Sequence, residues 1–230
     1  MHYLAYDLET TGLDPSKHQP IEIGIIKIND QTGDIEQYDI FIKTGEPLPD
    51  DTKRITGITD EMINEKGVPL EGAMKALFKV MGMRPDGADT DVIIIGHNII
   101  GFDNWFLKKY AEAYGFAFPA REQFFDTAGE FRGILLNEAR FVHECDFDYH
   151  DRILRLNAKG AHYNLTAACG YYNVLMDRAA HRAHNDCLYA LKVFEKQKGM
   201  SLLKYTPQQN DNGETNHVRR DENGQGAFNF

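Results

Sequence analysis

Two carboxylates stand two residues apart near the start of the chain, in the segment LAYDLETTGLD. The residues around them alternate as in a β-strand, so the side chains of Asp7 and Glu9 point to the same face. Like charges on one buried face repel, unless one pKa rises or a cation lies between them. Mg²⁺ and Mn²⁺ suit such oxygen ligands. The pair therefore indicates a metal site, although Asp-x-Glu also occurs on the solvent face of edge strands.

Two further segments carry groups suited to the same chemistry. In HNIIGFDNWFL, Asp103 begins an expected helix, and His97 and Asn98 end the apolar strand before it, where open α/β sheets place their sites. In HRAHND, His181 and Asp186 are five positions apart, and a histidine can act as a general base near neutral pH. Each segment also has an ordinary explanation, since Asp103 could complement a helix dipole and a histidine-rich helix start is often only solvated.

Together, four carboxylates and one histidine from three segments could converge on two divalent cations. Two-metal sites activate a water and stabilise the leaving oxygen in phosphodiester cleavage. Such ions would explain why a core strand carries Asp7 and Glu9, because the metals would take up their charge. His184 competes with His181 as the base by residue type alone.

The elements expected to position these groups form one α/β domain over residues 1–200. Strands are predicted at three segments that form an antiparallel meander, residues 2–9, 19–30 and 35–44. DVIIIGHN is expected to be a central strand covered on both faces, and residues 122–131 a short strand that runs into a helix. Further helices are predicted at 60–64, 70–81, 102–115, 165–170 and 178–199. Residues 130–162 lack clean periodicity and are expected to be an elaboration.

Composition limits the class of protein. The 230 residues are 42% hydrophobic and carry a net charge of −10. This charge argues against non-specific duplex binding, but bound metals reverse the local sign of an acidic cleft. No apolar run is long enough to span a membrane, the N-terminus does not read as a signal peptide, and three cysteines match no zinc pattern. We therefore expect a cytoplasmic protein with reduced thiols.

The three segments resemble, in order and spacing, the motifs of the DEDDh (DnaQ-like) 3′–5′ exonucleases, including the proofreading, epsilon-type exonuclease domain. DLETTGLD is similar to the first motif, HNIIGFDNWFL to the second and HRAHND to the third. RITGIT also resembles the Gly-Ile-Thr segment between the first two motifs, and FFDT the strand before the third. The resemblance covers residues 3–197, and the three motifs in series are highly specific.

The resemblance implies an RNase H-like fold, with a central mixed five-stranded sheet and helices on both faces. It implies hydrolysis from the 3′ end with release of nucleoside 5′-monophosphates, and two Mg²⁺ or Mn²⁺ ions in the site. The metal ligands would be Asp7, Glu9, Asp103 and Asp186, and His181 would deprotonate the attacking water. The residues expected along the terminal nucleotide or the cleft wall are Thr10, Thr11, Gly12, Leu13, His97, Asn98 and Phe102.

Single-stranded DNA 3′ ends are the expected substrate, in proofreading, repair or DNA degradation, with a polymerase or replication protein as a possible partner. An RNA 3′-end-trimming enzyme of the same family stays open as an alternative. So does a catalytically silent scaffold that binds nucleic acid or a polymerase, although all motif carboxylates are present. A further alternative is a structural domain whose acidic residues have no functional role, and such a domain would bind no Mn²⁺. Residues 206–230 are expected to be a disordered polar tail, whose Phe228 and Phe230 could instead dock on a replication protein.

Overall fold

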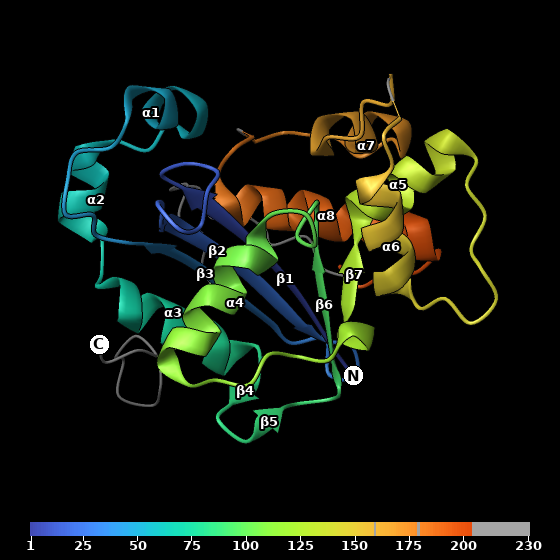
Figure 1. The fold of residues 1–230 in the computed structure, drawn as a ribbon, viewed down its shortest axis with the longest axis horizontal. Coiled ribbons are helices and arrows are strands. Elements are labelled where there is room, and N and C mark those ends of the chain that lie inside the picture. The colour runs from blue at the N-terminus through green and yellow to red at the C-terminus, as the bar shows by residue number, and fades with distance from the viewer. Residues whose placement is uncertain (159, 179, 204–230) are drawn as a thin grey trace.

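The computed structural model describes residues 1–158, 160–178 and 180–203. Its centre is a five-stranded sheet in the order β3-β2-β1-β6-β7, with a small hairpin of β4 and β5 at one side (Figure 1). The strands are β1 (His2–Thr10), β2 (Pro20–Asn29), β3 (Ile35–Phe41), β4 (Met83–Arg84), β5 (Gly87–Ala88), β6 (Val92–Gly96) and β7 (Phe124–Asp126).

The sheet is mixed, as the RNase H-like fold requires. β1 pairs antiparallel with β2, and β2 pairs antiparallel with β3, so the predicted meander is confirmed. β1, β6 and β7 run parallel to one another. Because parallel strands end at the same edge, the segments that follow β1, β6 and β7 all leave the sheet on one side. This edge receives the residues singled out in the sequence.

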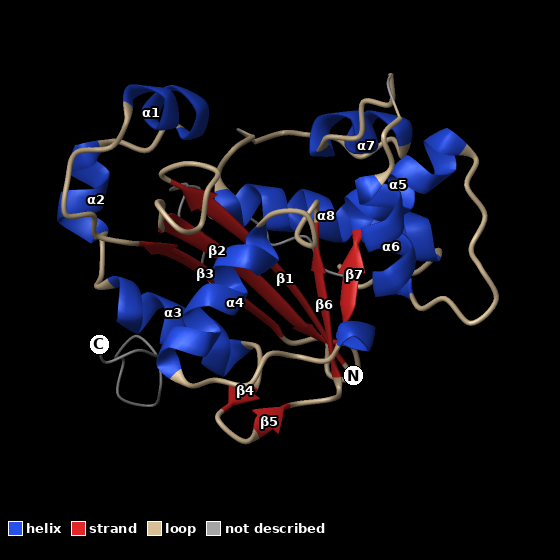
Figure 2. Ribbon diagram, in the orientation of Figure 1, coloured by secondary structure: helices blue, strands red, loops and turns tan. Residues whose placement is uncertain are grey.

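Helices cover both faces of the sheet (Figure 2). Helices α3 (Leu70–Val80) and α4 (Asp103–Tyr114) pack on one face around buried residues such as Tyr6, Leu77 and Phe106. Helix α8 (Ala183–Lys198) packs on the other face, against Ile26, Ile95 and Phe125. The remaining helices are α1 (Asp50–Thr56), α2 (Asp60–Lys66), α5 (Thr127–Leu136), α6 (Asp146–Arg155), α7 (Leu165–Tyr171) and the short 3₁₀ turn η1 (Arg121–Gln123).

The helix ends follow the expected local chemistry. Thr59 caps α2 by accepting a hydrogen bond from the N–H of Met62, and Gly115 ends α4 in the left-handed conformation that glycine tolerates.

Two of the described α-helices, α1 and α6, were not predicted. α1 buries only Thr52 and Thr56, which leaves no apolar stripe to recognise.

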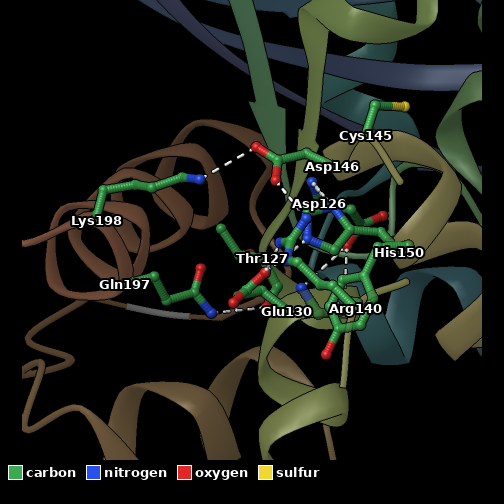
Figure 3. Close-up of polar contacts among 12 residues, drawn as sticks. Asp126, Thr127, Glu130, Arg140, Cys145, Asp146, His150, Gln197 and Lys198 are labelled. Atoms are coloured by element: carbon green, nitrogen blue, oxygen red, sulfur yellow. Dashed lines mark hydrogen bonds and ion pairs between the residues drawn. The ribbon is translucent and has the colours of Figure 1, made fainter. Parts of the chain in front are cut away.

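The other unpredicted helix, α6, lies inside the elaboration of residues 130–162. It carries many charges, and these form ion pairs: Arg152 binds Glu144 through Nε, and Arg140 binds Asp146. Its one fully buried imidazole, His150, lies against β7 and α5 (Figure 3). There, Nδ1 of His150 accepts a hydrogen bond from the backbone N–H of Asp126, with a nitrogen–nitrogen distance of 3.2 Å. The elaboration is therefore fastened to the sheet and packs as part of the same body.

The predicted tail of residues 206–230, with Phe228 and Phe230, lies outside the described residues. Within the part of the chain that the structure describes, no helix is long and apolar enough to cross a membrane.

The N-terminal turn of α8 lies directly on β2 at Gly24. An ideal Cβ there would lie 2.2 Å from the carbonyl carbon of Ala183. We therefore expect Gly24→Ala to lower the free energy of unfolding by about 2–3 kcal/mol, because backbone would have to move. Gly45→Ala is the control, since a Cβ at that position meets nothing within 4 Å. Urea unfolding of both variants checks the prediction, and equal midpoints would contradict it.

Candidate active site

Strand β1 presents Asp7 and Glu9 near its C-terminal end. The register places Asp7 opposite Gly24 and Glu9 opposite Glu22 of β2. Pairing becomes irregular between Glu9 and Thr10, so the strand turns away immediately after the second carboxylate. The pairing with β2 therefore fixes where these two carboxylates lie.

Asp103 lies at the same place, but it comes from the segment after β6, the strand that neighbours β1 on the side away from β2. It is the first residue of α4 and is only 3% exposed. Its Oδ1 accepts the N–H of Leu8, between the two carboxylates of β1, at 2.9 Å. The next residue, Asn104, accepts a hydrogen bond from the hydroxyl of Tyr6. The start of α4 is thus bonded to β1 on both sides of Asp7.

His181 and Asp186 come from the start of α8. Asp186 lies in the first turn of the helix, and His181 precedes the helix in a left-handed backbone conformation with φ 58°. The N–H of His181 donates to Asp186 Oδ2 at 3.2 Å. One potential ligand atom from each of Glu9, His181 and Asp186 lies within 4.8 Å of the others. His181 and Asp186, five positions apart in the sequence, therefore lie together beside Glu9.

Burial and mutual repulsion raise the pKa of every one of these carboxylates. Burial is the main cause for Asp7, whose pKa lies well above its ordinary value, with Asp103 and Glu9 adding repulsion. Burial, then Asp186 and Glu22, raise the pKa of Glu9 to about 8. Burial also raises the pKa of Asp103 to about 8 and that of Asp186 to about 6. Without a cation, the cluster holds protons that ordinary carboxylates release.

The donor set fits a divalent cation. Asp186 Oδ1 is buried and has no hydrogen-bond partner among the residues that the structure describes. Buried polar atoms are almost always partnered, so this oxygen is free to ligate. Oxygen-rich, negatively charged surroundings are those preferred by Mg²⁺ and Mn²⁺.

A cavity of about 420 Å³ opens beside the cluster. Of the predicted residues, it is lined by Asp7, His97, Asn98, His181 and Asp186. Residues 161–165 complete its wall, and they follow the elaboration. Sequence reasoning did not single out His162, Tyr163 or Asn164, which form part of this wall, because the segment shows no motif.

His97 lines the cavity, but protein groups engage both of its ring nitrogens. Nε2 lies 2.8 Å from the carbonyl oxygen of Tyr163, and Nδ1 lies 2.9 Å from Thr127 Oγ1. A carbonyl only accepts, so Nε2 carries the proton. Burial lowers the pKa of His97, which favours the neutral ring. His97 thus ties the wall of the cavity to α5 and offers a substrate only its carbon edge.

The turn after β6 is held by a carboxylate that sequence reasoning did not assign. Asp126 is fully buried and accepts the N–H groups of Asn98 and Ile100 at 2.8 and 2.9 Å. It also accepts from Ala128 and Gly129 and so caps α5. These contacts hold Asn98 at φ 67°, a left-handed conformation that asparagine adopts more readily than most residues with a Cβ.

The other predicted substrate contacts lie around the loop after β1 and at the start of α4. Thr10 Oγ1 donates to the carbonyl of Gly12, and Leu13 is 82% exposed. Phe102 packs edge-on against Phe106, with ring centres 5.4 Å apart. Thr10, Thr11, Gly12, Leu13 and Phe102 are not among the residues that line the cavity described above.

Two charged residues beside the cluster were also missed. Glu22 is fully buried, and Arg182 binds its Oε1 through Nη2 at 2.6 Å. The only local signal was a glutamate inside the apolar strand PIEIGIIKIN, where a charge needs a partner.

A family model described as RNase_T, Exonuclease, matches residues 4–194. The DNA polymerase III PolC-type protein of Mycoplasmopsis pulmonis is 29% identical over 209 residues, 88% of this chain. That of Listeria innocua is 27% identical over 210 residues, 91% of this chain. In both comparisons the chain spans 12% of the relative's length.

Solved structures of exonuclease I share the fold. A structure of exonuclease I superposes with a TM-score of 0.62 at 16% identity, covering 87% of this chain and 41% of that one. The Escherichia coli exonuclease I complex with a dA16 oligonucleotide gives a TM-score of 0.61, also at 16% identity, with the same coverage of both chains.

The raised pKa values predict a pH dependence of stability. Without divalent ions, we expect the free energy of unfolding to fall as the pH rises from 6.5 to about 8. In this window the folded state keeps protons on Glu9 and Asp103 that the unfolded chain has released. Each such proton costs about 1.4 kcal/mol per pH unit. Buried His97 and His184 act in the opposite direction, but only below their ordinary pKa of 6.5.

Thermal unfolding in EDTA across this window checks the prediction. Glu9→Gln should flatten the decline, and Mn²⁺ should reduce it for the wild type. Glu112→Gln, at an exposed position near the end of α4, should keep the wild-type slope. A wild-type slope in Glu9→Gln would show that Glu9 does not hold the extra proton.

Proposed function

This chain belongs to the RNase_T exonuclease family, a family of DEDD-type 3′–5′ exonucleases, and we propose that it hydrolyses the terminal phosphodiester bond of DNA 3′ ends with two divalent cations. The proposed substrate is a single-stranded or frayed end, and the product is a nucleoside 5′-monophosphate. The observation that carries the proposal is the meeting of four carboxylates and His181 at one edge of the sheet.

The roles follow from where the side chains lie. The cations would be held by Asp7, Glu9 and Asp186. Asp7 would be central, because its carboxylate interacts with Glu9 of β1 and with Asp186 of α8. Asp103 would complete the set, although the N–H of Leu8 already occupies its Oδ1. Bound Mg²⁺ or Mn²⁺ would ease deprotonation of water and stabilise negative charge on the phosphodiester.

His181 is the proposed general base. Its side chain is exposed beside the cavity, and its backbone is tied to Asp186. An exposed imidazole can accept a proton at the site and pass it to solvent. His184 is less suited to this role because its Nε2 lies 2.9 Å from Gln37 Oε1, over β3.

DNA is favoured over RNA by kinship. Relatives that match most of this chain are named as DNA polymerase III PolC-type proteins, and the structural neighbours include an exonuclease I bound to an oligodeoxynucleotide. The same kinship makes a polymerase or another replication protein the expected partner class, and the cytoplasm the expected place of action. The complete set of motif carboxylates favours an enzyme over a silent scaffold.

Asp7→Ala should abolish hydrolysis and leave the fold intact. Purified wild type and variant would be incubated with 5′-labelled single-stranded DNA and RNA, in Mg²⁺, Mn²⁺ or EDTA. We expect a metal-dependent ladder that shortens from the 3′ end for the wild type only. In EDTA the variant should melt at a higher temperature, because one buried carboxylate has been removed. Substantial activity in Asp7→Ala would rule out the proposed metal site, and a ladder on RNA alone would change the substrate.

His181→Ala should lower kcat by about 10²–10⁴-fold, the usual contribution of a positioned base. The matched variant His184→Ala should stay close to the wild-type rate. Steady-state kinetics on the labelled DNA would compare the two. If His184→Ala lost the activity instead, the base would be the second histidine.

A further inference from the structure

Glu22 is a buried carboxylate whose two oxygens hold two successive residues of the chain. Oε1 accepts from Nε and Nη2 of Arg182 at 2.9 and 2.6 Å. Oε2 accepts the N–H of Ala183 at 2.9 Å. Arg182 also lies within 3.5 Å of Asp39 Oδ2. The chain is thus fixed to β2 at the point where α8 begins, and Glu22 lies directly opposite Glu9.

His181 is the residue immediately before this attachment. It adopts a φ of 58° and its side chain is exposed. Its N–H is held by Asp186. A residue on an exposed segment keeps a defined position only if its neighbours are fixed, and here the neighbour is fixed by an ion pair.

We propose that Arg182 is a positioning residue, which through its ion pair with Glu22 holds the imidazole of His181 over the carboxylate cluster. This inference rests on the proposed function, in which His181 is the base. It adds a requirement that the proposed function does not contain: the base is correctly placed only while Arg182 is paired.

The pair is poorly explained by stability alone. A buried ion pair is often no more stable than apolar residues of the same volume, because both charges lose their hydration. The residues on either side of Glu22 in β2, Ile21 and Ile23, are fully buried and aliphatic. The planar guanidinium of Arg182 instead directs two N–H donors at one oxygen of Glu22, which fixes direction as well as distance. Such precision matters at a catalytic base, where a small misplacement is costly.

The first test separates kcat from KM on 5′-labelled single-stranded DNA. We expect Arg182→Ala to lower kcat by about 10²-fold with little change in KM, because the base is misplaced while the substrate surface is intact. Arg182→Lys keeps the charge and should recover part of the loss. The double variant Glu22→Gln, Arg182→Gln removes both charges, so it should fold even if the single variant does not, and its kcat should stay low.

The control is an equivalent pair outside the site. Arg152 binds Glu144 through Nε and Nη2 at 2.7 and 2.8 Å, within the elaboration. Arg152→Ala should keep the wild-type kcat. Wild-type kcat per folded molecule in Arg182→Ala or in the double variant would overturn the proposal, as would an equal loss in Arg152→Ala.

A second readout does not depend on activity. The ring resonance of His181 can be assigned by comparing NMR spectra of the wild type and His181→Asn. It should shift or broaden in Arg182→Ala and stay unchanged in Arg152→Ala. An unchanged His181 resonance in Arg182→Ala overturns the proposal even if no nucleic acid is cleaved. An inactive wild type whose resonance responds as expected would instead count against the proposed function alone.

Discussion

The repulsion between carboxylates at the end of β1 is the constraint on which the rest of the structure depends. Asp7 and Glu9 are fixed by the pairing of β1 with β2 and cannot move apart. Asp103 arrives with α4 from one face of the sheet, and Asp186 arrives with α8 from the other. Both helices must therefore be well packed, because their burial opposes the repulsion at their tips. The apolar clusters between the sheet and α3 and α4 on one face, and between the sheet and α8 on the other, provide this packing.

The ends of these elements are held by polar contacts where the apolar cores stop. Asp103 bonds to the backbone of β1, Asp126 bonds to the turn after β6, and Glu22 bonds to the start of α8. Each is a buried carboxylate that accepts backbone N–H groups. Such contacts have defined directions, which apolar packing lacks. The acidic composition of the chain thus serves positioning as well as the proposed metal chemistry.

The sequence was sufficient for those parts in which a local pattern determines the outcome. The alternation around Asp7 and the apolar run before His97 predicted strands, and the glycine after Tyr114 predicted a helix end. The role of Glu22, and that of Asp126 in the turn after β6, were not predictable in this way, because the partners are distant in the sequence. Arg182 follows Glu22 by 160 positions, and nothing near either residue indicates the other.

Helix α6 was missed for a different reason. Its charged residues find partners on η1, on α5, on α8 and in the loop before it. In the sequence, these charges look the same as charges on a solvent-exposed surface. The roles assigned to individual site residues remain predictions, although the structure brings the carboxylates and His181 together as the motif spacing suggested.

The position of α8 along the chain has a consequence for synthesis. It is the last helix of the described residues, and it packs on β1, β2 and β6, which are made much earlier. A nascent chain that has not yet emerged past residue 198 holds Asp7, Glu9 and Asp103 but lacks a docked Asp186 and His181. On the proposed mechanism, such a chain cannot cut nucleic acid. On the proposed mechanism, the order of elements therefore makes hydrolysis depend on the last of the described helices, because α8 brings the final two groups to the cluster.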